Sequence, residues 1–181
     1  MNTRFANSRA FTLVETLVAI AILMISISGP LAIANKALVA SLYAKDQSTA
    51  SFLAQEEMEI IKNLKDNSAP GSNWLNGYLN SCIGSVKCDL SVANNSNTIL
   101  APNHNYSCSS IGCRLNTTNN GYDSYLSGSP TIFYRYFNLT GSGCVANSSG
   151  SECQATVVVN WNEGTVPNAV TMSSELLNVA P

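Results

Sequence analysis

The chain has 181 residues, a length that allows one domain of ordinary size with extensions. Only 11% of the residues are charged and the formal net charge is −2, so the sequence lacks the basic patch typical of nucleic-acid-binding proteins, and no nucleic-acid partner is indicated. Hydrophobic residues concentrate near the N-terminus, whereas Asn, Ser, Thr and Gly crowd the later chain, which predicts an apolar stem and a polar head.

The first predicted element is an apolar helix over residues 11–34, after a basic leader at residues 1–10. The run exceeds the roughly 20 apolar residues, at about 1.5 Å each, that a helix needs to cross a hydrocarbon core. Arg4 and Arg9 precede this run and no acidic residue does, so the N-terminus is expected in the cytoplasm. Everything after Ala34 is then expected outside.

A single carboxylate, Glu15, stands in this apolar run. A charge at the middle of a membrane costs about 2.5–3.5 kcal/mol on insertion scales, so a partner is expected. In one interpretation the run is a secretory signal core, with a cleavage site at residues 32–34, a helix break at residues 28–30 and Asn35 as the new N-terminus. Glu15 argues against this interpretation. Two further alternatives are a plain uncleaved anchor and a Glu15 side chain that only reaches the lipid headgroups.

The stretch RAFTLVE at residues 9–15, with its basic leader and long apolar helix, resembles the processing site of type IV pilins and type II secretion pseudopilins. In that family a prepilin peptidase cuts before a Phe, methylates the new amine and leaves Glu as the fifth mature residue. The resemblance implies cleavage between Ala10 and Phe11, N-methylation of Phe11, and Glu15 as the assembly residue that pairs with a neighbouring subunit's amine. Such pairing offsets the cost of burying either charge. Ala10 stands where the family usually has Gly, and we expect slower cleavage without its loss.

Residues 35–66 are rich in good helix formers and predict an amphipathic helix that continues the stem. We expect Gly29-Pro30 to interrupt or kink the stem, because Pro removes a backbone donor. The predicted apolar stripe, broken by one Thr, consists of Leu38, Leu42, Thr49, Leu53, Ile60 and Leu64. We interpret it as the surface on which the head packs, with a coiled-coil seam as the alternative. The acidic run around Glu56, Glu57 and Glu59 predicts a solvated face.

The head, residues 67–181, contains all six cysteines, in the close pairs Cys82 and Cys88, Cys108 and Cys113, and Cys144 and Cys153. An even count in a loop-rich domain indicates disulfides and a compartment outside the reducing cytosol. Bridges between nearest neighbours are the first choice, each typically contributing about 2–4 kcal/mol. The spacings do not match structural zinc sites, so no metal site is predicted, and free thiols are the remaining alternative.

Clear strands are expected only late in the head. Residues 131–140 are dense in aromatic side chains, and residues 155–162 alternate apolar and polar positions. A turn at Glu163-Gly164 leads into a last strand at residues 168–179. The fold class is therefore α+β and pilin-like, with a long N-terminal helix packed against a C-terminal antiparallel sheet and disulfide-stapled loops.

No catalytic constellation or cofactor site is visible. His104, the sole histidine, is flanked by asparagines and is expected in a loop. The glycines at Gly141 and Gly143 are not followed by a helix, which a dinucleotide fingerprint requires. We therefore expect no enzyme.

The sequence as a whole favours a structural, minor subunit of a type IV pilus or a related secretion filament. The resemblance implies other pilins or pseudopilins, a prepilin peptidase, an inner-membrane assembly platform and membrane lipid as partners. It also implies a bacterial inner-membrane precursor, and then an extracellular pilus or a periplasmic pseudopilus. The alternatives are a secreted, disulfide-stabilised binding domain released after Ala34 and, last, a membrane-anchored enzyme.

Overall fold

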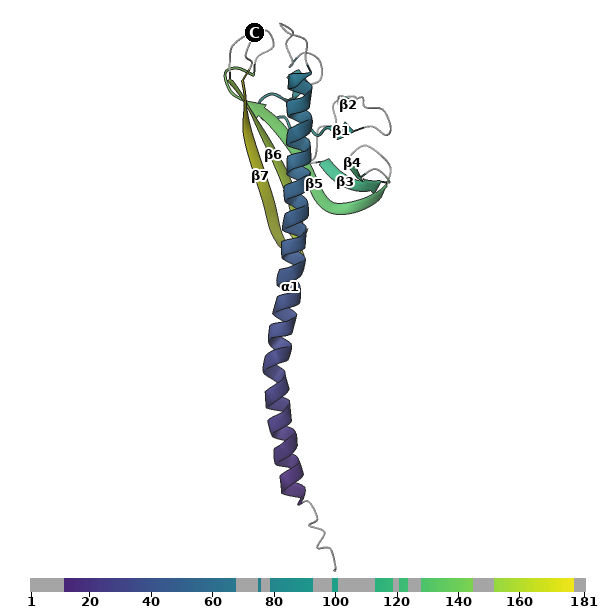
Figure 1. The fold of residues 1–181 in the computed structure, drawn as a ribbon, viewed down its shortest axis with the longest axis vertical. Helices are drawn as coiled ribbons and strands as arrows, with labels where there is room; N and C mark the ends of the chain where they lie inside the picture. The colour runs from purple at the N-terminus through teal and green to yellow at the C-terminus, as the bar shows by residue number, and fades with distance from the viewer. Residues whose placement is uncertain are drawn as a thin grey trace, which may run out of the picture. The chain divides into compact units, whose positions relative to one another are not determined.

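The computed structural model describes residues 12–67, 75, 79–92, 99–100, 113–118, 121–123, 128–144 and 152–177. Its elements, in chain order, are helix α1 (Leu13–Asp66), 3-10 helix η1 (Leu79–Cys82), and strands β1 (Ser91–Val92), β2 (Ile99–Leu100), β3 (Cys113–Thr118), β4 (Gly121–Asp123), β5 (Ser129–Thr140), β6 (Glu152–Glu163) and β7 (Val166–Leu177) (Figure 1). The predicted α+β, pilin-like class, with a long N-terminal helix followed by an antiparallel sheet, is confirmed. The chain divides into two compact units, Met1–Ala44 and Lys45–Pro181.

Helix α1 begins after Thr12, which caps its first turn. The Thr12 carbonyl accepts hydrogen bonds from the backbone N–H groups of Glu15 and Thr16, at 3.1 and 3.3 Å. The Thr12 hydroxyl accepts a further bond from the Glu15 N–H at 3.4 Å, the bond that an N-cap side chain supplies to an otherwise unpaired donor.

The helix passes through Pro30 without a break, so of the two outcomes predicted for Gly29-Pro30 the interruption is wrong, and the kink stays a prediction. A proline inside a helix lacks one donor, and the carbonyl four residues earlier, that of Ser26, loses its regular partner. The regular backbone hydrogen bonds before and after Pro30 continue the helix past this one lost bond. The hydroxyls of Ser26 and Ser28 donate to carbonyls three residues back, at 2.8 and 2.9 Å, and so remain paired within the helix.

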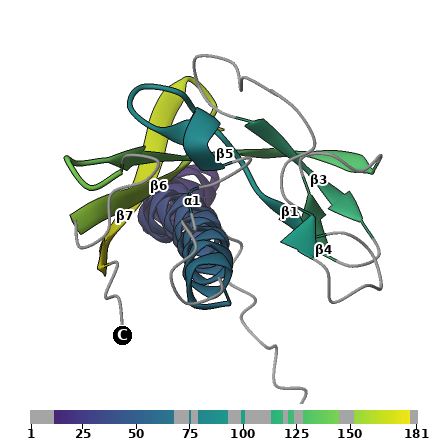
Figure 2. The ribbon, with the colours of Figure 1, turned by 90° about the horizontal axis from the view of Figure 1, so that it is seen from above.

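In the second unit, five strands form one antiparallel sheet in the order β4-β3-β5-β6-β7, and β1 and β2 form a separate small pair. Strands β5 and β6 cover the predicted strands at residues 131–140 and 155–162. Strand β7 begins two residues before the predicted last strand and ends at Leu177, and the predicted residues 178 and 179 lie outside the described residues. The predicted turn joins β6 to β7, and Gly164 adopts a φ of 62° there, which glycine accommodates without a steric cost. Figure 2, viewed from above, shows the part of α1 that belongs to the second unit, from Lys45 on, lying along one face of this sheet.

The core lies between that sheet face and the last turns of α1. Its helical members follow the spacing of one helix face: Ala50, Leu53, Ala54, Met58, Ile60 and Ile61. Its sheet members are the inward residues of β3, β5, β6 and β7: Leu115, Phe133, Phe137, Leu139, Ala155, Val157, Val159, Trp161 and Leu176.

The predicted stripe is therefore wrong in its first half. Leu38 and Leu42 are 64% and 59% exposed, and the buried face begins at Ala50. The prediction counted only large apolar residues. The structure uses two alanines on this face, and small side chains allow a sheet to approach a helix closely.

Two disulfides join cysteines that both lie among the described residues of the head. One joins Cys82 to Cys88, in the segment whose backbone pairs with β5 beyond the end of β3. The other joins Cys144 to Cys153, across the connection from β5 to β6. Cys113 is also disulfide-bonded, whereas Cys108 lies outside the described residues, so the predicted bridge between these two is not described.

Candidate functional site

The predicted assembly residue, Glu15, lies in the first turn of α1 and is exposed. A carboxylate in this position interacts favourably with the positive end of the helix dipole, an effect worth about 0.3–1 kcal/mol at an exposed site. This dipole interaction leaves the oxygen atoms of the Glu15 carboxylate available to a partner.

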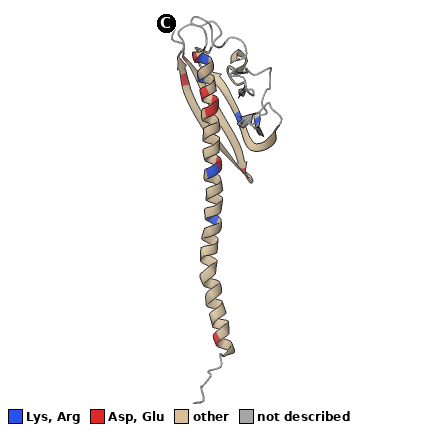
Figure 3. Ribbon diagram, turned by 45° about the vertical axis from the view of Figure 1, so that its right-hand side comes forward, with Lys and Arg blue, Asp and Glu red and all other residues tan. Residues whose placement is uncertain are grey.

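The helix that follows Glu15 is apolar on every side. No charged residue occurs between Glu15 and Lys36, as the sparse colouring of this part of α1 in Figure 3 makes visible. Its large apolar side chains are each at least half exposed: Leu13, Val14, Leu17, Val18, Ile20, Ile22, Leu23, Met24, Ile25, Ile27, Leu31 and Ile33. By length and composition, α1 qualifies as a candidate membrane span. An apolar surface of this extent requires lipid or other protein around it.

The two residues of the predicted processing site, Ala10 and Phe11, lie outside the described residues, as does His104. Their predicted roles are therefore not tested by the geometry. Within the described residues, no group of acidic, histidine or cysteine side chains is arranged to hold a metal ion.

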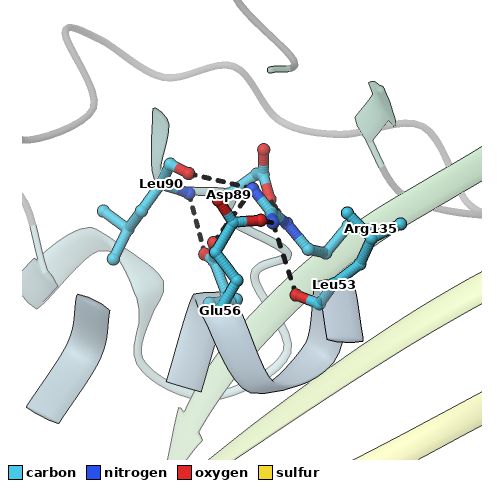
Figure 4. Close-up of polar contacts among 6 residues, drawn as sticks. Leu53, Glu56, Asp89, Leu90 and Arg135 are labelled. Carbon is cyan, nitrogen blue, oxygen red and sulfur yellow. Dashed lines mark hydrogen bonds and ion pairs between the residues drawn. The ribbon is translucent and has the colours of Figure 1, made fainter. Parts of the chain in front are cut away.

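A second polar site lies inside the head. Among the described residues three charged side chains are buried, Glu57, Asp89 and Arg135, and they come from α1, the segment before β1, and β5. The prediction of a solvated face is thus wrong for Glu57, which is 0% exposed. Figure 4 shows the Arg135 side chain extending from β5 toward the Asp89–Leu90 segment and the backbone of α1.

The Arg135 guanidinium binds the segment before β1 through two of its nitrogens. Its Nε donates to Asp89 Oδ1 at 2.7 Å, and its Nη2 donates to the Leu90 carbonyl at 3.1 Å. Glu57 completes this connection, because its Oε1 accepts the Leu90 backbone N–H at 2.8 Å while its Oε2 lies 3.1 Å from Arg135 Nη2.

The same guanidinium also binds α1. Its Nη1 donates to the Leu53 carbonyl at 3.4 Å and to Glu56 Oε2 at 3.3 Å, and the Glu56 side chain is 45% exposed. One side chain therefore ties β5 to the helix and to the segment before β1.

Burial is the main cause of the raised pKa of Glu57, and the nearby Asp89 carboxylate raises it further, while Arg135 acts in the opposite direction. Burial alone would lower the pKa of Arg135, but Asp89 and Glu57 outweigh it and the pKa is raised. Arg135 is therefore charged. Two buried carboxylates, those of Glu57 and Asp89, therefore share one buried cation.

Sequence reasoning missed this cluster, although a signal was present. Arg135 has the same parity along β5 as the inward-facing Phe133 and Phe137, so alternation alone placed it in the core. Glu57 likewise falls on the helix face defined by Leu53 and Ile61. These positions did not indicate that Arg135 and Glu57 contact each other, since the two residues lie far apart in the sequence.

Comparison with protein families gives a match of residues 5–29 to the prokaryotic N-terminal methylation motif. Neither the comparison with curated proteins nor that with solved structures gave a match. The matched motif is the hallmark of type IV pilin-like proteins, whose class is structural rather than catalytic. The matched residues include Glu15 and the start of the exposed apolar helix. The chain therefore carries the processing motif of this class at the end where the sequence predicted it.

Proposed function

We propose that the chain is a structural, minor subunit of a type IV pilus or a related secretion filament. A prepilin peptidase removes the leader at residues 1–10 and methylates the amine of Phe11. The helix over residues 11–34 then leaves the membrane and packs against the helices of other pilins or pseudopilins. Glu15 pairs with the amine of a neighbouring subunit and so positions each addition.

The observation that carries this proposal is the methylation motif, with Glu15 in the first turn of α1 and no other charged residue in this helix before Lys36. A carboxylate in such surroundings requires a cationic partner, because an unpaired charge is costly away from water. The N-methylated amine of an adjacent subunit supplies that partner in the proposed assembly.

The proposed location follows from the same features. The precursor spans the bacterial inner membrane once, with its N-terminus in the cytoplasm and its head outside, beside the assembly platform. The disulfides of the head suit an oxidising compartment. Assembly then places the subunit in an extracellular pilus or a periplasmic pseudopilus. Its irregular, cysteine-stapled head is the reason for proposing a minor rather than a major subunit.

The test is the N-terminus of the mature protein, determined by mass spectrometry on material from the native host. The proposal expects N-methylated Phe11. A mature protein that begins at Asn35 would instead identify a secreted binding domain, even though that cut falls within α1. A chain that retains its leader in cells making filaments would also contradict the proposal.

A further inference from the structure

Strand β7 forms one edge of the five-stranded sheet. It pairs with β6 at twelve consecutive positions, from Val166 opposite Glu163 to Leu177 opposite Glu152, without a register shift. In the part of the chain that the structure describes, no strand pairs with its other side. Alternate residues of an antiparallel edge strand direct their N–H and C=O groups away from the sheet, so β7 presents a regular row of backbone donors and acceptors.

This edge has few of the features by which proteins prevent edge-to-edge pairing. Such features include lysines, prolines, β-bulges and very short strands. β7 contains no lysine and no bulge, its single proline is Pro167 near its start, and its first charged residue is Glu175 near its end. The terminal side chains Val166 and Leu177 are apolar and 59% and 48% exposed. An unprotected edge of this length is suited to adding a strand.

We propose that the added strand is β7 of a second copy, paired antiparallel about a twofold axis at Thr171. Partners in such a pairing must have the same parity, because opposite residues lie on the same face of the sheet. The inward-facing residues of β7 are Asn168, Val170, Met172, Ser174 and Leu176.

When the axis lies at Thr171, each pair of opposite residues on the inward face consists of two apolar or two polar side chains. Val170 lies opposite Met172, Asn168 opposite Ser174, and Val166 opposite Leu176. On the outer face Thr171 meets its own copy, a β-branched and polar cross-strand pair of the kind that stabilises antiparallel sheets. The only charged residue, Glu175, lies opposite Pro167, so no like charges meet.

The neighbouring axes match poorly. An axis at Val170 places Asn168 opposite Met172, and an axis at Met172 places Val170 opposite Ser174 and Asn168 opposite Leu176. Each of these registers sets an amide or hydroxyl against an apolar side chain on the core face. The side-chain pattern therefore selects Thr171 as the centre.

The twofold axis reverses the direction of the second copy's head, so the two heads run antiparallel. This pairing does not require the proposed filament function. If that function holds, subunits of one filament share one direction and cannot make this contact with each other. In that case the contact joins copies that belong to two separate filaments facing each other.

The test uses the full-length protein in detergent, with single cysteines added and mild oxidation by copper phenanthroline. Thr171→Cys places two cysteines opposite each other at the axis, at a Cα separation of roughly 4.5–5.5 Å that a disulfide can span. Ser173→Cys is the matched control on the same face, since its two copies lie roughly 14 Å apart, beyond the reach of a disulfide. We expect linked dimers from T171C and monomers from S173C.

A mixture of Ala169→Cys and Ser173→Cys proteins should also cross-link, because these positions face each other across the axis. Thr171→Lys, which adds a charge at the edge, should reduce dimerisation of the otherwise unaltered protein at least about tenfold by light scattering, with circular dichroism showing that the head stays folded. The proposal is overturned if T171C stays monomeric, if T171C and S173C cross-link equally, or if T171K associates as strongly as the unaltered protein.

Discussion

Arg135 connects three segments of the head through one side chain, and its removal should be costly. Arg135→Met keeps much of the side-chain volume but leaves the buried carboxylates of Glu57 and Asp89 without their cation. Removing one partner of a buried ion pair typically costs about 3–5 kcal/mol, because the remaining charge stays buried and uncompensated. We expect a loss of this size in the free energy of unfolding, measured by urea titration of the detergent-solubilised protein.

The matched control is Arg114→Met. Arg114 is exposed and lies over the Tyr134 ring, with its Cζ 5.9 Å from the ring centroid. An exposed contact of this kind contributes about 0.5–1 kcal/mol. Equal losses for the two variants would show that the cluster does not hold the head together.

Glu57 should make the stability of the head depend on pH. Its pKa in the folded protein is raised, first by burial and then by Asp89, above the value of about 4.3 expected in the unfolded chain. The stabilisation that comes from a protonated Glu57 is therefore complete below the unfolded pKa and is lost as the pH rises through the folded pKa. Glu57→Gln imitates the protonated side chain and should remove this loss.

The measurement is the difference in unfolding free energy between Glu57→Gln and the unaltered protein, at pH values from 4 to 9. The variant should gain relative stability as the pH rises, by at most about 1.4 kcal/mol per pH unit. Glu59→Gln, at an exposed position on the same helix, is the control and should show little change. A difference that stays constant across the range would mean that Glu57 titrates normally in the folded head.

The position at which α1 begins to contact the sheet can be located by two leucines. Leu53 is 3% exposed within the core, whereas Leu42 is 59% exposed. Leu53→Ala should lower the unfolding free energy by about 2–5 kcal/mol through lost burial and the cavity left behind. Leu42→Ala should change it by less than about 0.5 kcal/mol, as is usual for surface sites. Comparable losses of unfolding free energy in the two variants would instead support the longer packing stripe that the sequence predicted.

The elements differ in how well the sequence predicts them, for physical reasons. The long strands were predictable because the aromatic density of residues 131–140 and the alternation in residues 155–162 are both typical of strands in a half-buried sheet. The packing face of α1 was only half predicted, since alanines carry little hydrophobic signal yet allow close approach. The sequence left open whether Pro30 interrupts or kinks α1, because a local rule for proline ignores the hydrogen bonds that continue on both sides. The Arg135 cluster depends on contacts between distant residues, which no local pattern contains.

The two units of the chain differ in whether they bury their own apolar side chains. Residues 45–181 bury their own apolar side chains between helix and sheet, and so form a core without a partner. The apolar side chains of α1 before Lys36 are exposed, and their burial must come from lipid or from other chains. Glu15 is the only charged residue in the described part of that apolar segment. A change there tests the assembly role with the least effect on the fold of the head.

Glu15→Ala should leave membrane insertion and head folding intact, because removing a charge makes the segment more apolar and the head has its own core. The variant should remain in the inner-membrane fraction at normal abundance. Its amount in sheared filaments should fall at least about tenfold, the effect of losing about 1.4 kcal/mol of pairing energy at each addition. The measurement is immunoblotting of both fractions from the native host.

Glu59→Ala, which removes an exposed carboxylate on the same helix beyond the apolar segment, is the control and should incorporate normally. Normal incorporation of Glu15→Ala would show that the carboxylate is not the assembly contact, whereas loss of both variants would indicate that any change in helix charge disturbs assembly.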